Sequence, residues 1–292
     1  MTERSLLLGL IGSGIDGSLS PQMQEGQGKA KGIPLVYRKL DLSRLKLGPA
    51  DVPELFRWCV RLGFDGLNIT HPAKYAIVPS LDSLSAEVRV IGAVNTVVID
   101  QATGATTGSN TDWSGFIRGL RWQLGEVSTR QVTVLGAGGA GAAVTYGLLR
   151  TGSGKAVIYD HVRSRAEELA ERMTAAFSSD RVSVAPNITA ALDGADGLVQ
   201  ATPTGMSGHP GLPLPADLLR PDLWVADVVY FPMETELVKV ATATGCRVAH
   251  GGGMAIFQAA EGFTLFTGQT PDIPQMVNHF QELIRTQPDM RI

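Results

Sequence analysis

The chain has 292 residues, of which 44% are hydrophobic and 18% charged, and its formal net charge at pH 7 is −3. This length accommodates two domains of ordinary size, and the composition is that of a globular protein. A net charge this close to neutral gives no electrostatic basis for binding nucleic acid or an anionic membrane, so neither is predicted as a partner.

Cysteine, histidine and apolar patterns exclude further classes of protein. The two cysteines, Cys59 and Cys246, are far apart and the five histidines lack ligand spacing, so we predict neither a disulfide framework nor a metal site. No apolar run approaches the ~20 residues needed to span a bilayer, and Leu6–Ile11 is too short for the core of a secretory signal. The sequence predicts a cytoplasmic protein.

Short apolar segments alternate with helical patterns in the first third of the chain. The predicted strands are Leu6–Ile11, Leu35–Leu40, Gly66–Thr70 and Ala93–Ile99. The predicted helices are Gln22–Ala30, Pro53–Leu62 and, at the end of this region, Trp113–Leu120.

From Gln131 onward the alternation becomes more regular. The predicted strands are Val132–Leu135, Ala156–Asp160, Val182–Val184, Leu198–Ala201 and Trp224–Val229. The predicted helices are Gly139–Arg150, Ser164–Phe177, Glu236–Thr244, Met254–Phe266 and Ile273–Arg285. Strands that alternate with helices in this way predict an α/β fold with a parallel, doubly wound sheet. The rhythm changes at Gly108–Asp112 and at His250–Gly253, which are the candidate linkers.

A glycine-rich turn follows the strand Val132–Leu135 and opens the next helix. Its residues Gly136, Ala137, Gly138, Gly139, Ala140 and Gly141 fit the pattern G-x-G-x-x-G, and Asp160 lies 19 residues beyond Gly141 at the end of the next strand. The glycines permit a tight turn and a close approach to a pyrophosphate, which the helix amides then face. A glycine turn that binds nothing is the alternative, but strand, glycines, helix and acid together favour a dinucleotide site.

Asp160 also bears on which dinucleotide is bound. A carboxylate there accepts hydrogen bonds from an adenosine ribose and repels a 2′-phosphate, so NAD is favoured over NADP. His161 is mostly neutral at pH 7 and is a poor phosphate ligand. Arg163 and Arg165 leave the alternative open, because either can reach a phosphate or simply be solvated at the start of a helix.

Hydroxyl and amide side chains gather in the first third of the chain. Ser18 and Ser20 lie in a loop before Pro21 that we expect to be extended, so that both hydroxyls point the same way. A capping loop for the following helix is the alternative.

Asn68 and Thr70 alternate at the end of a strand, with Lys74 one turn further on and Asn95 as a second amide. Asp112 starts a helix, where it is also a plausible N-cap. Together these groups predict a pocket for a polyhydroxylated ligand.

Eight segments resemble, in the same order, motifs of the shikimate/quinate dehydrogenase family. They extend from about Leu8 to Gly268 and read G-S-L-S-P, G-L-N-I-T-H-P-A-K, I-G-A-V-N-T-V-V, G-S-N-T-D-W-S-G-F, L-G-A-G-G-A-G, A-T-P-T-G-M, D-V-V-Y and F-Q-A-A-E-G-F. The resemblance implies a substrate-binding domain over residues 1–112, completed by residues 252–292, and a Rossmann-type domain over residues 113–251. It also implies an NAD(P)-dependent enzyme that interconverts shikimate and 3-dehydroshikimate, with quinate as an alternative substrate.

The resemblance assigns roles to individual residues. Those implied to bind the substrate are Ser18, Ser20, Asn68, Thr70, Lys74, Asn95, Asp112, Tyr230 and Gln258. Those implied to bind the cofactor, beside the glycine turn and Asp160, are Arg165, Thr202, Pro203, Val228, Gly251 and Met254. Lys74 and Asp112 are the implied catalytic pair, and the sequence leaves open which of them accepts the proton.

The chain departs from the family pattern at a few positions. Gln24 and Glu25 replace His-Asn or His-Glu, Ala73 replaces a larger residue, and Gln200 replaces Asn. Asp160-His161 stands where NADP-using members have Asn-Arg, which favours the NAD-linked branch. Ser20 stands where quinate-accepting relatives of that branch tend to carry threonine, so we expect shikimate to be the better substrate.

Two rival functions and the assembly state remain open on the sequence. One rival is a folate-linked methylene dehydrogenase, which is not expected to carry Ser18-x-Ser20 with N-T-D and Gln258. The other is a catalytically inactive paralogue that binds the dinucleotide or a shikimate-like acid, against which Lys74 and Asp112 argue. The protein is expected to be a monomer or a homodimer.

Overall fold

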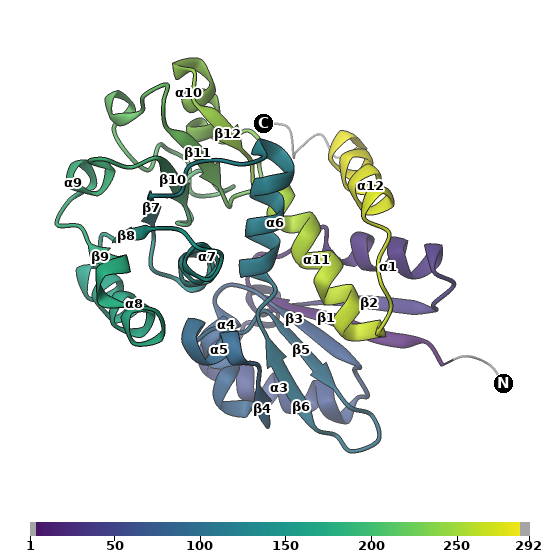
Figure 1. Ribbon diagram of the computed structural model, residues 1–292. Helices are drawn as coiled ribbons and strands as arrows, with labels where there is room; N and C mark the ends of the chain where they lie inside the picture. The colour runs from purple at the N-terminus through teal and green to yellow at the C-terminus, as the bar shows by residue number, and fades with distance from the viewer. Residues whose placement is uncertain (1–3, 287–292) are drawn as a thin grey trace. The chain divides into compact units, whose positions relative to one another are not determined.

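The structure is a computed structural model that describes residues 4–286, and the chain divides into two compact units. Of the described residues, unit 1 contains residues 4–111 and Ala259–Leu283, and unit 2 contains Asp112–Gln258 and residues 284–286. Both units are α/β, and each has one six-stranded sheet that can be followed in Figure 1. The α/β fold class predicted from the sequence is therefore confirmed.

Unit 1 is built on a mixed sheet with the strand order β2-β1-β3-β5-β6-β4. Its strands are β1 (Leu6–Gly12), β2 (Leu35–Asp41), β3 (Gly66–Ile69), β4 (Ser83–Leu84), β5 (Thr96–Ile99) and β6 (Thr106–Ser109). Its helices are α1 (Ser20–Ala30), α2 (Leu42–Leu45), α3 (Val52–Arg61), α4 (Ala73–Ala76), α5 (Ala86–Ile91), the later part of α11 (Gly252–Thr267) and most of α12 (Ile273–Thr286). Strand β5 runs antiparallel to β3 and β6, whereas β1, β2 and β3 are parallel.

Both faces of the unit 1 sheet are buried, and the two faces have different apolar clusters. Leu67 and Ile69 belong to a cluster that includes Phe56 of α3 and Ile77. Leu8, on the other face, belongs to a cluster that includes Phe266 of α11. A Cβ added to Gly66 would lie 2.4 Å from the ring of Phe266, so the helix packs directly on the strand at a glycine.

Unit 2 is built on a fully parallel sheet with the strand order β12-β11-β10-β7-β8-β9. Its strands are β7 (Gln131–Leu135), β8 (Lys155–Tyr159), β9 (Val182–Val184), β10 (Gly197–Gln200), β11 (Trp224–Asp227) and β12 (Arg247–Ala249). Numbered from its own first strand, this order is the 3-2-1-4-5-6 arrangement of dinucleotide-binding folds, read from the other edge. The order of the strands reverses between β7 and β10, and such folds bind their ligand at this position.

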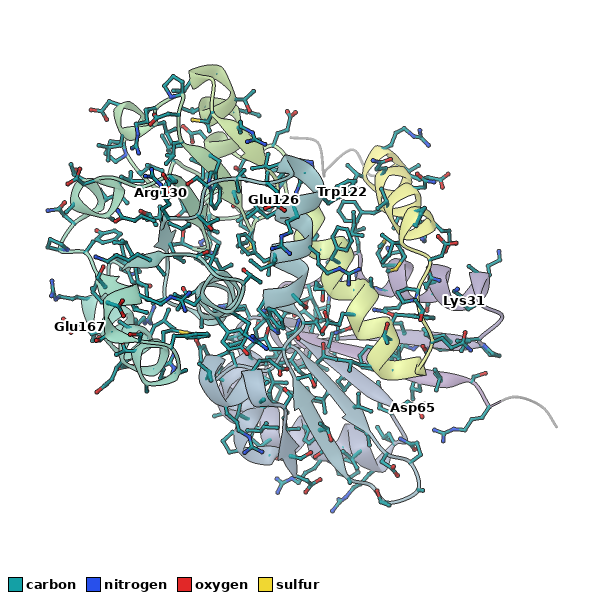
Figure 2. The ribbon with its side chains drawn as sticks, viewed as in Figure 1. Lys31, Asp65, Trp122, Glu126, Arg130 and Glu167 are labelled. Carbon is teal, nitrogen blue, oxygen red and sulfur yellow. The ribbon has the colours of Figure 1, made fainter. Side chains whose placement is uncertain are left out.

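Helices cover both faces of the unit 2 sheet. They are α6 (Asp112–Leu124), α7 (Gly139–Arg150), α8 (Arg163–Ala176), α9 (Ile188–Leu192) and α10 (Glu236–Thr244), together with the first part of α11. Val144 of α7 and Phe116 of α6 join Val132 in one apolar cluster. Trp122 of α6 and Glu167 of α8, which are labelled in Figure 2, are both exposed. Single 3₁₀ turns occur in both units at Pro49–Asp51, Val78–Ser80, Ser179–Arg181 and Ala216–Leu218.

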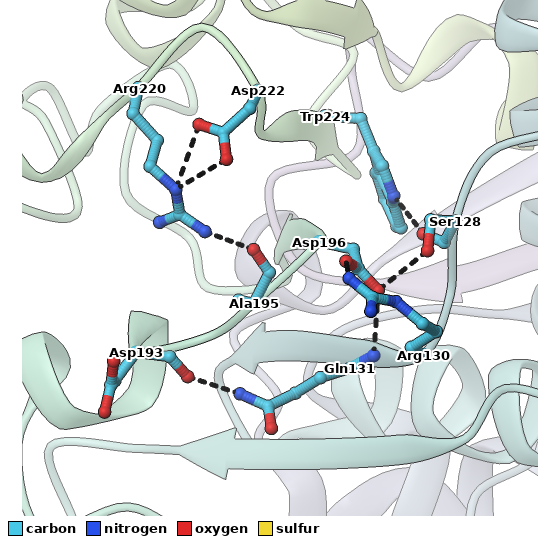
Figure 3. Close-up of polar contacts among 9 residues, drawn as sticks. All are labelled: Ser128, Arg130, Gln131, Asp193, Ala195, Asp196, Arg220, Asp222 and Trp224. Atoms are coloured by element: carbon cyan, nitrogen blue, oxygen red, sulfur yellow. Dashed lines mark hydrogen bonds and ion pairs between the residues drawn. The ribbon is translucent and has the colours of Figure 1, made fainter.

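The amino ends of the unit 2 strands carry a polar network that is separate from the predicted sites (Figure 3). The Asp196 carboxylate accepts hydrogen bonds from Ser128 Oγ at 2.8 Å and from Arg130 Nη2 at 2.7 Å. A cavity of about 230 Å³ lies at this edge and is lined by Asp196, Trp224 and Arg247, among others. None of the predicted site residues lines this cavity, and ligands of such folds bind at the opposite, carboxyl ends of the strands.

Several element boundaries differ from the predicted ones. The strand predicted over Ala93–Ile99 begins only at Thr96, and part of the predicted linker Gly108–Asp112 belongs to β6. Strand β6 reads Thr-Thr-Gly-Ser and has no apolar pattern, so it is held by its neighbours β5 and β4 rather than by its own sequence. Within the described residues, no helix is long and apolar enough to cross a membrane.

Candidate active site

The sheet of unit 1 brings the predicted substrate residues to one edge. The carboxyl ends of the parallel strands β1 and β3 lie at this edge. Strand β1 is followed by the segment that leads to Ser18 and Ser20, here called the serine loop, and β3 is followed by Thr70. Strand β5 runs the other way, so its amino end, preceded by Asn95, lies at the same edge. The arrangement follows from strand direction alone, and it places three separate segments of the sequence side by side.

The serine loop is compact rather than extended. Leu19 has φ −86° and ψ −2°, and α1 begins at Ser20, so the expected extended conformation is wrong. The two hydroxyls nevertheless meet, because Ser18 Oγ donates to Ser20 Oγ at 3.2 Å. Proline at the start of a helix accounts for the difference, since its fixed φ suits the first helical turn.

Asp41, at the end of β2, anchors the chain that leads into the serine loop. Its carboxylate accepts from the amides of Gly14 at 3.1 Å and Ile15 at 3.0 Å. Burial raises the pKa of this carboxyl, but these amide donors outweigh burial and leave the pKa below its ordinary value. A carboxylate held in this way fixes the start of the loop.

The two predicted amides belong to one buried hydrogen-bond network. Asn68 Nδ2 donates to Thr96 Oγ1 at 3.2 Å, and Thr96 Oγ1 donates to Asn95 Oδ1 at 3.0 Å. Asn95 Nδ2 in turn donates to Thr111 Oγ1 at 2.9 Å. Asn68, Asn95, Thr96 and Thr111 are all buried, and Tyr37 Oη donates to Asn68 Oδ1 at 2.8 Å.

Lys74 lies in the short helix α4, which follows β3 after the cis peptide bond His71–Pro72. Its side chain is half-buried, and its carbonyl accepts from the amide of Val94, which ties α4 to the Asn95 segment. Asp112 is buried and is the first residue of α6. Because the boundary between the units falls between Thr111 and Asp112, the pairing of Lys74 with Asp112 stays a prediction.

Two further predicted substrate residues lie in unit 2. Tyr230 follows β11 and is half-buried. Gln258 lies in α11, where its Nε2 donates to the carbonyl of Ala255 at 3.1 Å. A Cβ on Gly115 would lie 2.7 Å from the Gln258 amide nitrogen, so α6 and α11 pack closely at this glycine.

The glycine turn of unit 2 has the geometry that a dinucleotide requires. Gly136 has φ +96°, and a Cβ added to it would lie 2.9 Å from the carbonyl oxygen of Ala201. A Cβ on Gly141 would lie 1.8 Å from the Gly136 oxygen, whereas nothing lies within 4 Å of one on Gly138. Gly138 therefore leaves open space in front of the first amides of α7, which lack partners within the helix. A pyrophosphate fits this space.

Asp160 directly follows β8 and lies against the glycine turn. Its carboxylate accepts from the amides of Ala137 at 2.8 Å and Val162 at 2.9 Å. Arg163 pairs with Glu167 at 2.7 Å, and Arg165 is exposed. A carboxylate has about four acceptor positions, so Asp160 retains the capacity to bind ribose hydroxyls.

The remaining predicted cofactor residues also lie at the carboxyl edge of the unit 2 sheet. Thr202 and Pro203 follow β10, and Thr202 Cγ2 would lie 2.9 Å from a Cβ on Gly136. Val228 follows β11, and its carbonyl oxygen would lie 2.6 Å from a Cβ on Gly251. Met254 is in the first turn of α11.

Asp227 is the last residue of β11, and its carboxyl group is buried at the carboxyl edge of the unit 2 sheet. Burial raises its pKa to about 6, against hydrogen bonds from Thr235 Oγ1 and the Val229 amide that lower it. Within residues 4–286, no group of three or more histidine, cysteine, aspartate or glutamate side chains is placed to hold a metal ion.

Sequence reasoning missed several residues that support these sites. Gln200, noted only as a departure, donates from Nε2 to Thr202 Oγ1 at 2.8 Å and to the Thr204 carbonyl at 2.9 Å, so it organises the loop after β10. Tyr37, Thr96 and Thr111 were not singled out. The signal for Tyr37 was available, because a tyrosine inside a buried strand needs a partner for its hydroxyl.

The chain therefore has two α/β units: one has the strand order and glycine turn of a Rossmann-type dinucleotide-binding domain, and the other has a cluster of hydroxyl and amide side chains at one edge of its sheet. Residues 10–97 match the family model described as the shikimate dehydrogenase substrate binding domain. A relative from Streptomyces avermitilis named shikimate dehydrogenase (NADP(+)) is 47% identical, over 98% of each chain. One from Corynebacterium glutamicum named quinate/shikimate dehydrogenase (NAD(+)) is 46% identical, over 96% of this chain and 99% of the relative.

Solved structures show the same similarity. Quinate dehydrogenase from Corynebacterium glutamicum in complex with NAD matches with a TM-score of 0.87 at 45% identity, over 95% of this chain and 99% of that one. Shikimate 5-dehydrogenase from Listeria monocytogenes, in complex with shikimate and NAD, matches with a TM-score of 0.81 at 28% identity, over 95% of this chain and 98% of that one. The chain belongs to the shikimate/quinate dehydrogenase family of NAD(P)-dependent oxidoreductases, which excludes the folate-linked alternative.

Proposed function

We propose that this protein oxidises shikimate to 3-dehydroshikimate, and catalyses the reverse reaction, with NAD as its preferred cofactor. The observation that carries the proposal is the set of hydroxyl and amide groups at the carboxyl edge of the unit 1 sheet. These groups are neutral hydrogen-bonding partners, which suit a small ring with several hydroxyls and one carboxylate.

The substrate residues divide by the part of the substrate that they bind. Ser18 and Ser20, which are already in contact with each other, bind the carboxylate. The residues that bind the ring hydroxyls are Asn68, Thr70, Asn95 and Gln258, with Tyr230 near them. Residues 1–112 with 252–292 form the substrate domain in this proposal, and residues 113–251 bind the dinucleotide.

Lys74 and Asp112 carry out the proton transfer. The hydroxyl that is oxidised lies between them, and its proton passes to the pair as the carbonyl forms. The proton is assigned to the pair rather than to either residue alone. The glycine turn and Asp160 would hold the dinucleotide, which would supply the acceptor for the hydride of the carbinol carbon.

The preference for NAD rests on Asp160. Similarity does not decide it, because the NADP-linked and NAD-linked relatives are 47% and 46% identical to this chain. The Asp160 side chain is only 6% exposed and is held by two backbone amides, so it cannot swing away from a 2′-phosphate. Two negative groups at that position repel each other, and Arg163 is already paired with Glu167.

Shikimate is the preferred substrate and quinate the secondary one. Quinate has a tetrahedral carbon with an added hydroxyl where shikimate has a planar one, which shifts the carboxylate relative to the amides. A misplacement of about 1 Å at the reacting centre can cost roughly 10²-fold in rate. The serine at position 20, in place of threonine, is the observation behind this preference.

The test is a grid of steady-state kinetics with shikimate and quinate, each with NAD and with NADP. The highest kcat/KM is expected for shikimate with NAD. A quinate value equal to or above that for shikimate refutes the substrate preference, and a higher value with NADP refutes the cofactor preference. No turnover in any combination favours an inactive binding paralogue, a function that the dehydrogenase names of the relatives above do not support. Cytoplasmic localisation and a monomeric or homodimeric state stay predictions.

A further inference from the structure

A continuous chain of hydrogen bonds runs across the unit 1 sheet at the edge that carries the predicted substrate residues. It runs from Tyr37 through Asn68, Thr96 and Asn95 to Thr111, with donor–acceptor distances of 2.8, 3.2, 3.0 and 2.9 Å. Every bond donates in the same direction, from the Tyr37 hydroxyl toward Thr111. Each of the five residues is at most 6% exposed, so water does not compete for these bonds.

Strand register explains why these side chains meet. Tyr37 and Gly66 are both paired with Leu8 in the parallel part of the sheet, and Asn68 is the cross-strand partner of Thr96. Residues in register point to the same face of a sheet. Because Asn68 is two residues after Gly66 on β3, the side chains of Tyr37 and Asn68 lie on the same face of the unit 1 sheet.

Two backbone groups fix the orientation of both amides. Asn68 Nδ2 lies 3.4 Å from the carbonyl oxygen of Asn95, which can only accept, so the nitrogen and not the oxygen faces it. Asn95 Oδ1 lies 2.8 Å from the amide of Thr111, which can only donate, so the oxygen faces it. Neither amide can turn over without placing two donors or two acceptors together.

We propose that Tyr37 and Thr96 are positioning residues that hold Asn68 as a hydrogen-bond acceptor for one substrate hydroxyl. Both N–H groups of Asn68 are used, toward Thr96 and the Asn95 carbonyl, and one lone pair of its oxygen is filled by Tyr37. What Asn68 directs to a ligand is the second lone pair of Oδ1. This inference rests on the proposed function, because it takes the substrate to be a polyhydroxylated ring bound at Asn68.

Asn95 has the opposite polarity. Its oxygen accepts from both the Thr96 hydroxyl and the Thr111 amide. A hydroxyl can donate a hydrogen bond to the Asn68 acceptor, whereas a ketone, an ether or a fluorine cannot. The network thus specifies a hydroxyl at the substrate position that faces Asn68.

The test is a thermodynamic cycle that combines the substitution Tyr37→Phe in the protein with the removal of one hydroxyl at a time from the substrate. Values of kcat/KM are measured for wild type and variant with shikimate and with its two analogues that lack one of the non-reacting hydroxyls. Tyr37→Phe should lower kcat/KM for shikimate on the order of 10-fold, the value of one neutral hydrogen bond. It should have little effect with the analogue that lacks the hydroxyl facing Asn68, and the full effect with the other analogue.

Thr96 provides the matched control within the same network. Thr96→Ser keeps the hydroxyl and should retain the wild-type discrimination among the three substrates. Thr96→Val removes the hydroxyl and should lose this discrimination. These variants decide the question if Tyr37→Phe does not fold. Equal losses with all three substrates mean a purely structural role and overturn this assignment while leaving the proposed function intact. Failure of wild type to oxidise shikimate at all overturns both.

Discussion

The sites that we propose at the carboxyl edges of the two sheets are built in opposite ways. In unit 1 the site consists of side chains: serine hydroxyls, the Asn68 and Asn95 amides, and Lys74. In unit 2 the site consists of backbone: a positive-φ glycine, open space at Gly138 and the first amides of α7. The substrate site therefore depends on the functional groups of its side chains, whereas the cofactor site depends on the absence of Cβ atoms at its glycines.

This difference predicts different responses to substitution. Removing a functional group from the unit 1 site should change kinetic constants and leave the fold intact. Adding a methyl group to the unit 2 turn should change cofactor binding or stability, according to whether the space at that glycine is open or filled. Asp160 is an exception in unit 2, because it is a side chain whose charge bears on cofactor choice.

The largest effect is expected from Lys74→Ala in unit 1. Turnover should fall at least ~10²-fold, which is the lower range for removing a positioned acid–base group, while KM for shikimate changes much less. Lys31→Ala, at the exposed end of α1, is the matched control and should behave as wild type. Near-normal turnover of Lys74→Ala, with an unchanged circular dichroism spectrum, would remove Lys74 from the chemistry.

Replacing Asp160-His161 with Asn-Arg should reverse cofactor choice. The ratio of kcat/KM with NADP to that with NAD is expected to rise on the order of 10²-fold, because a repulsive charge is replaced by an attractive one. His161→Arg alone keeps both amide bonds of Asp160 and should show only part of the rise. If wild type already prefers NADP, the exposed Arg165 is the group that recognises the phosphate.

Two glycines of the same turn provide a matched pair for the backbone site. Gly136→Ala should destabilise the protein by about 2–3 kcal/mol, because its φ is +96° and a Cβ would crowd the Ala201 carbonyl. Gly138→Ala should leave the unfolding free energy unchanged and raise KM for NAD, because its Cβ enters space that only the cofactor needs. Urea denaturation with steady-state kinetics separates the two outcomes. Equal destabilisation by both variants would contradict the comparison.

A smaller, pH-dependent effect is expected at Asp227. Burial raises its pKa to about 6 from an ordinary value of 3.8, so the folded state holds its proton more tightly than the unfolded state does. The stability from this residue is present below pH 3.8 and is lost as the pH rises through 6. Relative to Asp227→Asn, wild type should lose on the order of 2 kcal/mol of unfolding free energy between pH 4 and pH 7. Parallel pH profiles for the two proteins would show that the carboxyl does not titrate in this range.

The sequence predicted local pattern well and long-range register poorly. The apolar strand Val132–Leu135 differs from β7 by one residue, and the helix Gly139–Arg150 is confirmed at both ends. The alternation of Asn68 and Thr70 could be read from the sequence. The pairing of Asn68 with Thr96 could not be read from the sequence, because the two residues are 28 positions apart and their pairing depends on β5 running antiparallel to β3. The prediction of an extended serine loop was wrong for a local reason, because helix α1 begins at Ser20 itself.

Unit 1 is formed by two stretches of the chain that are far apart in sequence, and this affects the order in which its parts are completed during synthesis on the ribosome. Unit 2 is almost continuous in the chain, whereas the sheet of unit 1 needs residues from Ala259 onward to complete one of its faces. Gln24 and the Ala259 carbonyl, which share a hydrogen bond, are 235 residues apart, and Phe266 packs at Gly66 across a similar separation. Contacts of such separation form slowly because the intervening loop must close first. All strands of the unit 2 sheet are therefore synthesised before the helix that covers Leu8 and its neighbours, so the first strands synthesised are among the last to be fully covered.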